Sequence, residues 1–459
     1  MKVKQIDFSN GKILENIFLA ATPMLVAQIL NLMYNIIDRI YIGKIAGEGT
    51  LALSGIGLCF PIISFITAFT NLYGVGGSPL CSIERGKGNL TEAENIMNTS
   101  FYLLILTGIS ITILGIIFCK PLLYLFGASD ITLKYAQPYM QIYLLGTIFS
   151  MVALGLNPFI NAQGFASMGM FTIFIGAITN IILDPIFIFK FNLGIKGAAY
   201  ATIISQLLSA IFVIKFLTGD KTELKLKIKE RIKLKRERVL NIVSLGSVSF
   251  IMQCTNSLVQ IASNNMLSAF GGDIYISIMT IINSIRQIFD TPVHAITDGT
   301  SPILSYNYGA KKYDNVKKAI FIMTTLALIY TAFVWGIISI FPEFLIRIFN
   351  EDEALLSASV SALHIYFFAF IFQALMYSGQ AVFKSLNKKK QAIFFSLLRK
   401  VVIVVPLTFI LPYINGWGVK GVFAAEPVSN FLGGSICFIG MLLTILPELK
   451  RKKELLKTE

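Results

Sequence analysis

The stretch GGSPLCSIERGK at residues 76–87 has a counterpart, GTSPILSYNYGA, at residues 299–310. Their shared Ser-Pro pair and a later glycine align at one offset of 223 residues. LGIKGAAYA at 193–201 aligns with WGVKGVFAA at 417–425 at an offset of 224. Because separate segments keep nearly one register, we interpret the chain as two copies of one structural unit.

The composition of both copies is that of an integral membrane protein. Of 459 residues, 55% are hydrophobic and 14% are charged, and the mean hydropathy is +0.71. Apolar runs of about 20 residues or more recur along the chain, each long enough to cross a bilayer as a helix, whereas barrel strands would be shorter and alternating. We therefore predict an all-α fold with twelve transmembrane helices, at roughly 14–42, 52–83, 96–118, 133–160, 167–189, 197–217, 239–267, 275–305, 317–341, 357–383, 391–413 and 419–446.

The net charge of +14 follows the membrane topology. Lys and Arg concentrate in alternate loops, whereas the intervening loops hold one or two basic residues each. The positive-inside rule explains this pattern better than nucleic-acid binding does, so we expect no nucleic-acid partner. The sequence predicts a multi-pass protein of the cell membrane, in contact with lipid, with both termini in the cytoplasm.

Each copy holds six predicted spans, an even number, so both copies begin on the same side of the membrane. This indicates two six-helix bundles related by a pseudo-two-fold axis along the membrane normal, an arrangement typical of transporters. We predict an N-terminal lobe at 1–217, a basic cytoplasmic linker at 218–238, a C-terminal lobe at 239–446 and a cytoplasmic tail at 447–459. We expect a monomer.

The segment NIILDPIFIF, residues 180–189, places Asp184 inside an apolar run. Asp38, Asp184 and Thr202 each lie about 7–8 Å inside the predicted external boundary, at about 1.5 Å per residue. Tyr34 precedes Asp38 by four residues, and Asn180 precedes Asp184 by four, so each pair shares a helix face. This all-oxygen set suits a proton or a hard cation such as sodium, and buried acids in membrane helices usually have a function.

Pro185 follows this acid directly. Proline removes one helix hydrogen bond, so a backbone carbonyl near residue 181 becomes available and the helix can bend there. We expect Pro185 to act as a hinge and to add an oxygen to the site.

The twelve spans in two copies, these polar residues, and a proline early in the first span, Pro23, resemble the multidrug and toxic compound extrusion (MATE) transporters. The resemblance implies that Tyr34, Asp38, Asn180, Asp184 and Thr202 bind the coupling ion. It further implies that the first helix bends, with Pro23 as a hinge. Some members carry acids in the seventh and tenth spans, where this chain has glutamines 253 and 373.

The C-terminal copy offers a second polar set. Arg286, Asp290 and Asp298 recur at spacings of four and eight residues in the eighth span, and Glu426 corresponds to Thr202 of the other copy. These four residues are candidates for a substrate site or a second polar site. An internal salt bridge between Arg286 and Asp290, which stabilises a polar helix in lipid, is the alternative interpretation.

The predicted function is secondary antiport: export of organic, often cationic and amphiphilic, compounds in exchange for H⁺ or Na⁺, by alternating access between the lobes. No phosphate-binding loop of the G-x-x-x-x-G-K-[ST] type is present, and we expect neither enzymatic activity nor a cofactor. The main alternative is a lipid-linked oligosaccharide flippase, which requires a basic cavity. The basic residues inside the spans lie mostly near span ends: Arg39, Lys215, Arg286, Arg399 and Lys400.

Overall fold

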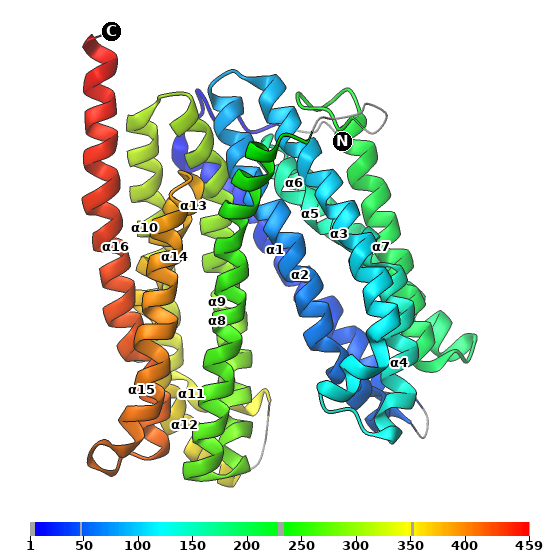
Figure 1. Cartoon of the computed structure of the whole chain (residues 1–459). Helices are drawn as coiled ribbons and strands as arrows, with labels where there is room; N and C mark the ends of the chain where they lie inside the picture. Colours follow the sequence, from blue (N-terminus) through cyan, green and yellow to red (C-terminus); the bar gives the residue numbers. More distant parts are fainter. Residues whose placement is uncertain (1–4, 46–47, 228–233, 350–352, 459) are drawn as a thin grey trace. The chain divides into compact units, whose positions relative to one another are not determined.

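The computed structural model describes residues 5–45, 48–227, 234–349 and 353–458, and this part of the chain contains helices but no strand. Figure 1 shows the helices along the chain. Those of the N-terminal half are α1 (Ile13–Gly43), α2 (Gly49–Gly86), α3 (Leu90–Leu125), α4 (Asp130–Leu145), α5 (Thr147–Ala162), α6 (Ala166–Pro185), η1 (Ile186–Lys190) and α7 (Gly194–Thr218). Those of the C-terminal half are α8 (Arg236–Gly271), α9 (Asp273–Gly309), α10 (Tyr313–Ile340), α11 (Pro342–Arg347), α12 (Glu353–Phe367), α13 (Ile371–Ser385), α14 (Lys389–Leu397), η2 (Leu398–Val404), α15 (Val405–Ile410), η3 (Leu411–Gly416) and α16 (Val419–Thr458).

These helices confirm the predicted all-α membrane fold, and each of the twelve predicted spans falls on one helix or on a run of adjoining helices. Within the described ranges, nine helical segments are long and apolar enough to cross a membrane, and two bent pairs raise the number to eleven. The remaining span is α9, which is 37 residues long but is not among the segments that are apolar enough. It carries Arg286, Asp290 and Asp298, so apolarity alone does not identify it.

Two predicted spans are bent. The fourth consists of α4 and α5, which meet at 58° at Gly146, and the tenth consists of α12 and α13, which meet at 47°. Gly146 lies against Ile203 of α7, where an added Cβ would come within 2.6 Å of the isoleucine side chain. A larger residue would not fit between these helices, so the bend and the packing of α7 depend on the same glycine.

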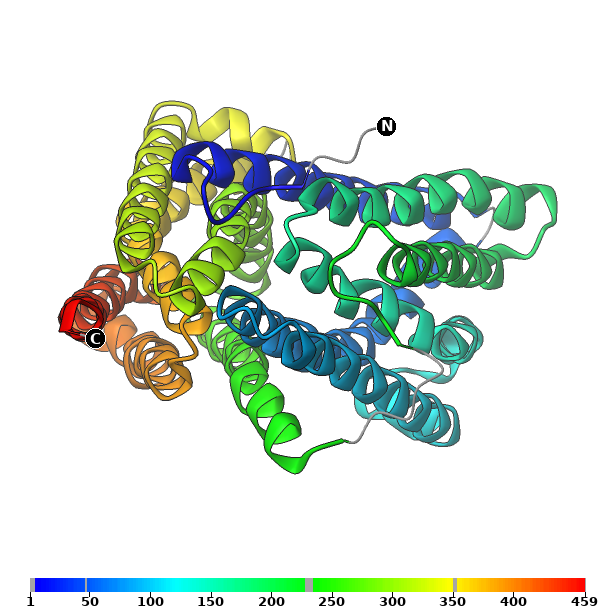
Figure 2. The ribbon, with the colours of Figure 1, turned by 90° about the horizontal axis from the view of Figure 1, so that it is seen from above.

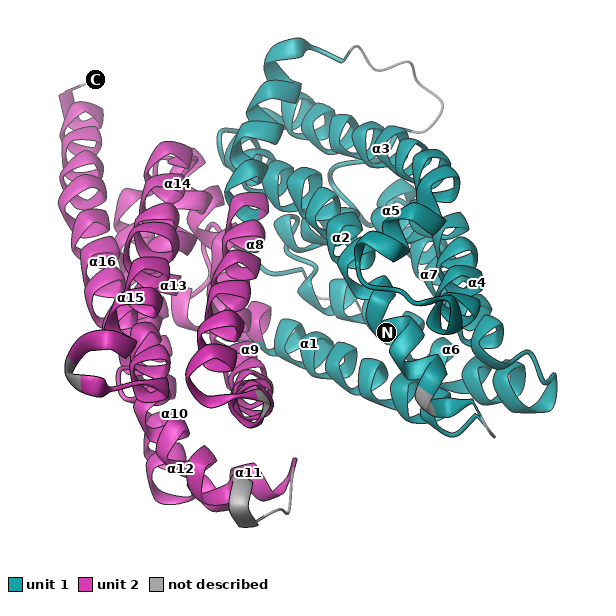
Figure 3. Cartoon of the chain, turned by 60° about the horizontal axis from the view of Figure 1, so that its bottom comes forward, with its two compact units in different colours: residues 1–7, 22–249 teal, residues 8–21, 250–459 magenta. Residues whose placement is uncertain are grey.

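The chain forms two compact units, which Figure 3 colours separately. Unit 1 comprises residues 1–7 and 22–249, and unit 2 comprises residues 8–21 and 250–459. Two of the three boundaries between the units fall inside a helix, 21/22 in α1 and 249/250 in α8, and the third, 7/8, precedes α1. The start of α1 therefore belongs to unit 2, and the start of α8 belongs to unit 1. This division differs from the predicted one, which separates the two lobes at the 218–238 linker.

The starts of α1 and α8 pack closely against glycines at positions related by the repeat. In unit 1, a Cβ on Gly76 would lie 2.5 Å from the carbonyl oxygen of Ile242, and one on Gly246 would lie 1.8 Å from that of Leu72. In unit 2, a Cβ on Gly299 would lie 2.8 Å from the backbone nitrogen of Ala21. Gly76 and Gly299 are the first residues of the two aligned segments, so the repeat preserves a close backbone approach of α8 to α2 and of α1 to α9.

The beginning of the basic linker packs against unit 1. Figure 2 shows this green segment, residues 218–227, crossing the ends of the helices. Gln163 Oε1 accepts a hydrogen bond from the Leu224 amide at 2.9 Å, and Asn98 Oδ1 accepts one from the Lys227 amide at 2.7 Å. Leu224 and Leu226 are buried. This part of the linker is therefore an ordered strap attached to the lobe.

Candidate functional sites

The first candidate site lies inside unit 1, between α6 and α7. Asp184, the next-to-last residue of α6, is fully buried, and the Asn180 side-chain amide donates to its Oδ1 at 3.3 Å. The same amide lies 3.4 Å from the hydroxyl oxygen of Thr202. Thr202 Oγ1 also donates to the Ala198 carbonyl at 3.0 Å, as is common for a helix hydroxyl.

The first helix brings a second acid to this place. The carboxyl groups of Asp38 and Asp184 lie within hydrogen-bonding reach of each other. Tyr34, one turn before Asp38 on α1, lies near both acids and near Tyr143. The five residues predicted as one site, Tyr34, Asp38, Asn180, Asp184 and Thr202, thus come together in unit 1.

This cluster is rich in acceptors and poor in donors. Among the described residues, Asp38 Oδ1, Asp184 Oδ2, Asn180 Oδ1 and Gln206 Oε1 are buried oxygens without a hydrogen-bond donor. A cavity lined by Tyr34, Asn180, Thr202 and Gln206 opens beside them. Buried oxygens left without a donor are costly, so this geometry suits a proton, a cation or ordered water.

The backbone beside Asp184 is irregular. Pro185 ends α6, and the chain continues as a π-helical turn, η1, in which the Phe191 amide donates to the Ile186 carbonyl at 2.9 Å. Such wide turns concentrate at functional sites. Pro185 therefore ends the regular hydrogen-bond pattern next to the buried acid.

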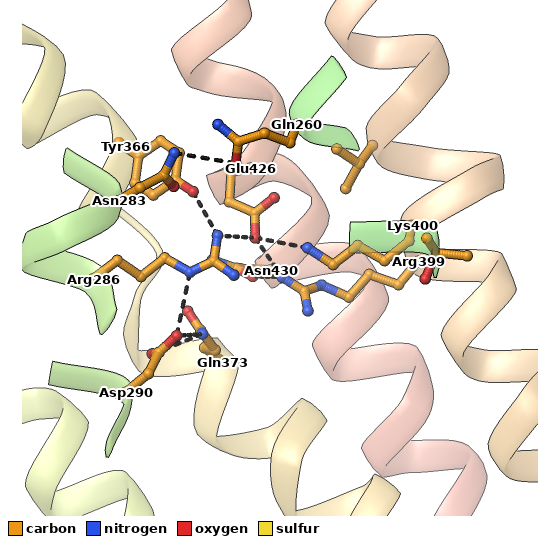
Figure 4. Close-up of polar contacts among 12 residues, drawn as sticks. Gln260, Asn283, Arg286, Asp290, Tyr366, Gln373, Arg399, Lys400, Glu426 and Asn430 are labelled. Carbon is orange, nitrogen blue, oxygen red and sulfur yellow. Dashed lines mark hydrogen bonds and ion pairs between the residues drawn. The ribbon is translucent and has the colours of Figure 1, made fainter. Parts of the chain in front are cut away.

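A second polar cluster lies inside unit 2 and is shown in Figure 4. Arg286 of α9 donates through Nε to Asp290 at 3.2 Å and through Nη1 to the Tyr366 hydroxyl at 2.6 Å. The same Nη1 lies 3.4 Å from Glu426 Oε1. The predicted Arg286–Asp290 pair is therefore present, and it extends to Glu426 of α16.

Two cations that were not among the predicted site residues complete this cluster. Arg399 Nη2 and Lys400 Nζ, both of η2, lie 2.7 and 3.3 Å from Glu426 Oε1, and Arg399 also donates to the Asn430 side chain. Both cations are buried. Two adjacent basic residues inside the predicted span 391–413 were the available signal, but their sequence position did not show which helix they face.

Gln373 and Asp298, two further polar residues noted in the sequence of this half, differ in whether they join the cluster. Gln373 donates to both oxygens of Asp290 at 2.9 and 3.1 Å. Asp298 is exposed and, within the described part of the chain, does not join the network. The C-terminal cluster is therefore built from Arg286, Asp290 and Glu426 together with the cations of η2, without Asp298.

Apolar helices long enough to span a membrane, in two units with charged side chains buried inside each, are typical of multi-pass membrane transporters. Comparison with known proteins agrees with this class. The MatE family model matches residues 23–186 and 249–410, and the chain belongs to the MATE family of multidrug efflux transporters.

Individual relatives are distant but cover nearly the whole chain. The multidrug export protein MepA of Staphylococcus haemolyticus is 24% identical over 443 residues, which are 95% of this chain and 96% of that protein. A crystal structure of a MATE protein in the bent conformation is 22% identical, with a TM-score of 0.92, and the match covers 99% of this chain and 100% of the other. A MATE transporter in an outward-facing conformation, also 22% identical, has a TM-score of 0.90, over 98% of this chain and 100% of that one.

Proposed function

We propose that this protein is a secondary antiporter that exports amphiphilic organic compounds while protons or sodium ions flow inward through the acidic site of unit 1. Family membership supports the export of small organic molecules, and relatives named multidrug export proteins cover almost the full chain. The observation that carries the ion-coupling part is the contact of Asp38 with Asp184 among unpaired oxygens.

Two carboxylates this close repel each other when both are ionised, so either one holds a proton or a cation lies between them. Both outcomes bind one positive charge from solution. Asn180, Thr202 and Tyr34 add amide, hydroxyl and phenol oxygens, the ligand types that hard cations prefer. Ion entry changes the charge of α1 and α6 together, and this couples the site to the two helices that contain the prolines.

We propose Pro23 and Pro185 as the hinges of this coupling. The division between the compact units falls in α1 between residues 21 and 22, directly before Pro23, and Pro185 directly follows Asp184. A proline leaves one carbonyl of its helix without a donor, so bending at these points costs less than elsewhere in the helix. Both termini are proposed to face the cytoplasm, in agreement with the basic loops.

The test is dye transport in membrane vesicles with sodium and pH gradients imposed separately. We expect Asp38→Asn and Asp184→Asn each to reduce ion-driven export at least tenfold, because each removes a charge that the ion neutralises. Glu343→Gln is the matched control, since Glu343 is an exposed acid in unit 2. Undiminished export in both aspartate variants would remove the proposed ion site.

A lipid-linked oligosaccharide flippase is the second candidate, favoured by the three cations inside unit 2. Two carboxylates in the same cluster neutralise two of those cations. The remaining charge is too small for a doubly charged pyrophosphate, so antiport of simpler amphiphiles is the function that we propose.

A further inference from the structure

The polar cluster of unit 2 carries more positive than negative charge. Arg286, Arg399 and Lys400 face only two carboxylates, Asp290 and Glu426, which leaves a formal surplus of one positive charge when all five groups are ionised. Tyrosine, glutamine and asparagine side chains make up the rest of the network in Figure 4. The carboxylates of the cluster therefore do not neutralise all of its basic side chains.

This surplus lies well inside the membrane-spanning region. Lys400 follows the start of α14 by eleven residues, about 16 Å along a helix, and Glu426 follows the start of α16 by seven, about 10 Å. A cation inside a membrane bundle normally pairs with an anion or marks a transport pathway.

One acceptor of the cluster is shared several times, whereas one donor has no acceptor in the part of the chain that the structure describes. Glu426 Oε1 is shared by all three cations, and Asp290 accepts from Arg286, Gln373 and Tyr377. Arg399 is 3% exposed, and its Nε has no acceptor within the described residues. A buried guanidinium nitrogen without an acceptor indicates that the cluster lacks one hydrogen-bond acceptor.

Arg286 is the member of the cluster that a solute can reach. Its side chain is 21% exposed, compared with 4% for Arg399 and 8% for Lys400. Beside it, the Asn283 amide donates to Gln260 Oε1 at 3.4 Å, and Gln260 is exposed. Amide groups and a guanidinium therefore form the accessible edge, and the two buried cations of η2 lie behind Glu426, as Figure 4 shows.

The repeat relates this cluster to the acidic site of unit 1. Glu426 occupies the position of Thr202, and Asn430 that of Gln206, each at an offset of 224 residues. The unit 1 site has unpaired acceptors and two acids, whereas the unit 2 site has an unpaired donor and extra cations. One repeated frame thus carries sites of opposite charge, and the second site suits an anion as the first suits a cation.

We propose that Arg286, with Arg399 and Lys400 behind it, binds the singly charged anionic group of a transported amphiphile: a carboxylate, a sulfonate or a phosphate diester. A guanidinium donates charge-assisted hydrogen bonds to such oxyanions. The inference rests on the proposed function as an exporter and narrows its substrates to anionic or zwitterionic amphiphiles.

The experiment compares two fluorescent amphiphiles with the same aromatic body, measured by equilibrium binding to the purified protein in nanodiscs. The anion is 8-anilinonaphthalene-1-sulfonate, and its neutral partner is N-phenyl-1-naphthylamine. We expect Lys400→Met and Arg286→Gln each to weaken sulfonate binding at least tenfold and to change binding of the neutral amine less than twofold. Lys420→Met, at an exposed lysine of α16, serves as the control and leaves both unchanged.

Equal losses for both probes, or no loss of sulfonate binding in both variants, would overturn the proposal. Competition by inorganic phosphate at constant ionic strength separates the sources of the anion: displacement of the sulfonate by millimolar phosphate would assign the site to an inorganic ion and contradict a substrate role. The measurement needs no gradient, so Asp38→Asn should keep sulfonate binding even if it abolishes transport. Loss of transport thus tests the antiport proposal, and loss of sulfonate binding tests the anion site, so the two proposals can fail separately.

Discussion

Arg399 and Lys400 are neighbours in the sequence, yet both lie within ion-pair distance of one oxygen, Oε1 of Glu426, at 2.7 and 3.3 Å. Adjacent side chains of an α-helix point about 100° apart, which normally separates them. Here the backbone from Leu398 to Val404 is π-helical. The length of the two side chains and this irregular turn together allow both charges to reach Glu426 of α16.

Because this cluster has three basic and two acidic side chains, we expect removal of an acid and removal of a base to affect the free energy of unfolding differently. Glu426→Gln leaves three cations facing one carboxylate, so we expect the free energy of unfolding to fall by about 3–5 kcal/mol. Lys400→Met leaves two of each sign, and we expect a change near zero or a small gain. Thermal unfolding of the purified protein in detergent measures both. A loss in Lys400→Met as large as that in Glu426→Gln would argue against a surplus charge.

Ion binding at Asp38 and Asp184 should stabilise the folded protein. A ligand at 100 times its dissociation constant adds about 2.7 kcal/mol. We expect the melting temperature of the unaltered protein to rise when sodium replaces choline, or to rise with proton concentration if H⁺ is the coupling ion. Asp184→Asn should remove that response, and Glu343→Gln should retain it. A response of equal size in the Asp184 variant would contradict the proposed ligand set.

The close approach of α8 to α2 predicts a steric effect. In Gly246→Ala, the new methyl group would lie 1.8 Å from the Leu72 carbonyl oxygen, so the backbones must separate, and we expect a loss of about 1–3 kcal/mol. The control is Gly336→Ala in α10, where an added Cβ meets nothing within 4 Å. Melting temperatures of the two variants provide the comparison, and equal values would mean that this contact is dispensable.

The strap at residues 218–227 predicts a change in proteolysis. Asn98 is buried and binds both the Lys225 carbonyl and the Lys227 amide, so Asn98→Ala removes two hydrogen bonds, each worth about 1 kcal/mol. We expect trypsin to cleave the linker roughly tenfold faster, as followed by the appearance of two fragments on a gel. Asn35→Ala, at an exposed position of α1, should leave the rate unchanged. An unchanged rate in Asn98→Ala would show that the strap opens independently of this contact.

Helix count and the pairing of near neighbours were predictable because both depend on local properties of the chain. The length of an apolar run identifies a transmembrane helix regardless of which helices pack around it. Asn180 and Asp184 are four residues apart, so any helix places them on one face, and the structure contains their hydrogen bond. Asp38 and Asp184 come from helices far apart in sequence, and their contact was inferred from equal depth and from the family resemblance.

The irregular parts of the helices were less predictable. The bend at Gly146 has no proline in its immediate sequence and depends on the side chain of Ile203, which another helix supplies. The π-helical turn at Leu398–Val404 likewise has no signature in residue order. Such distortions follow from packing between helices, which a one-dimensional pattern does not contain.

By itself, the sequence determined that this chain crosses a membrane in twelve helices, repeats its frame once, and carries acids in its first lobe, because hydrophobic length, repeat register and helix periodicity are properties of the linear chain. Only the tertiary structure decided that Arg286, Arg399 and Lys400 meet at Glu426 and leave one charge unbalanced. The physical reason is that a contact between helices depends on the rotation and depth of each helix. Packing sets these quantities, and in unit 2 it joins residues that are up to 140 positions apart.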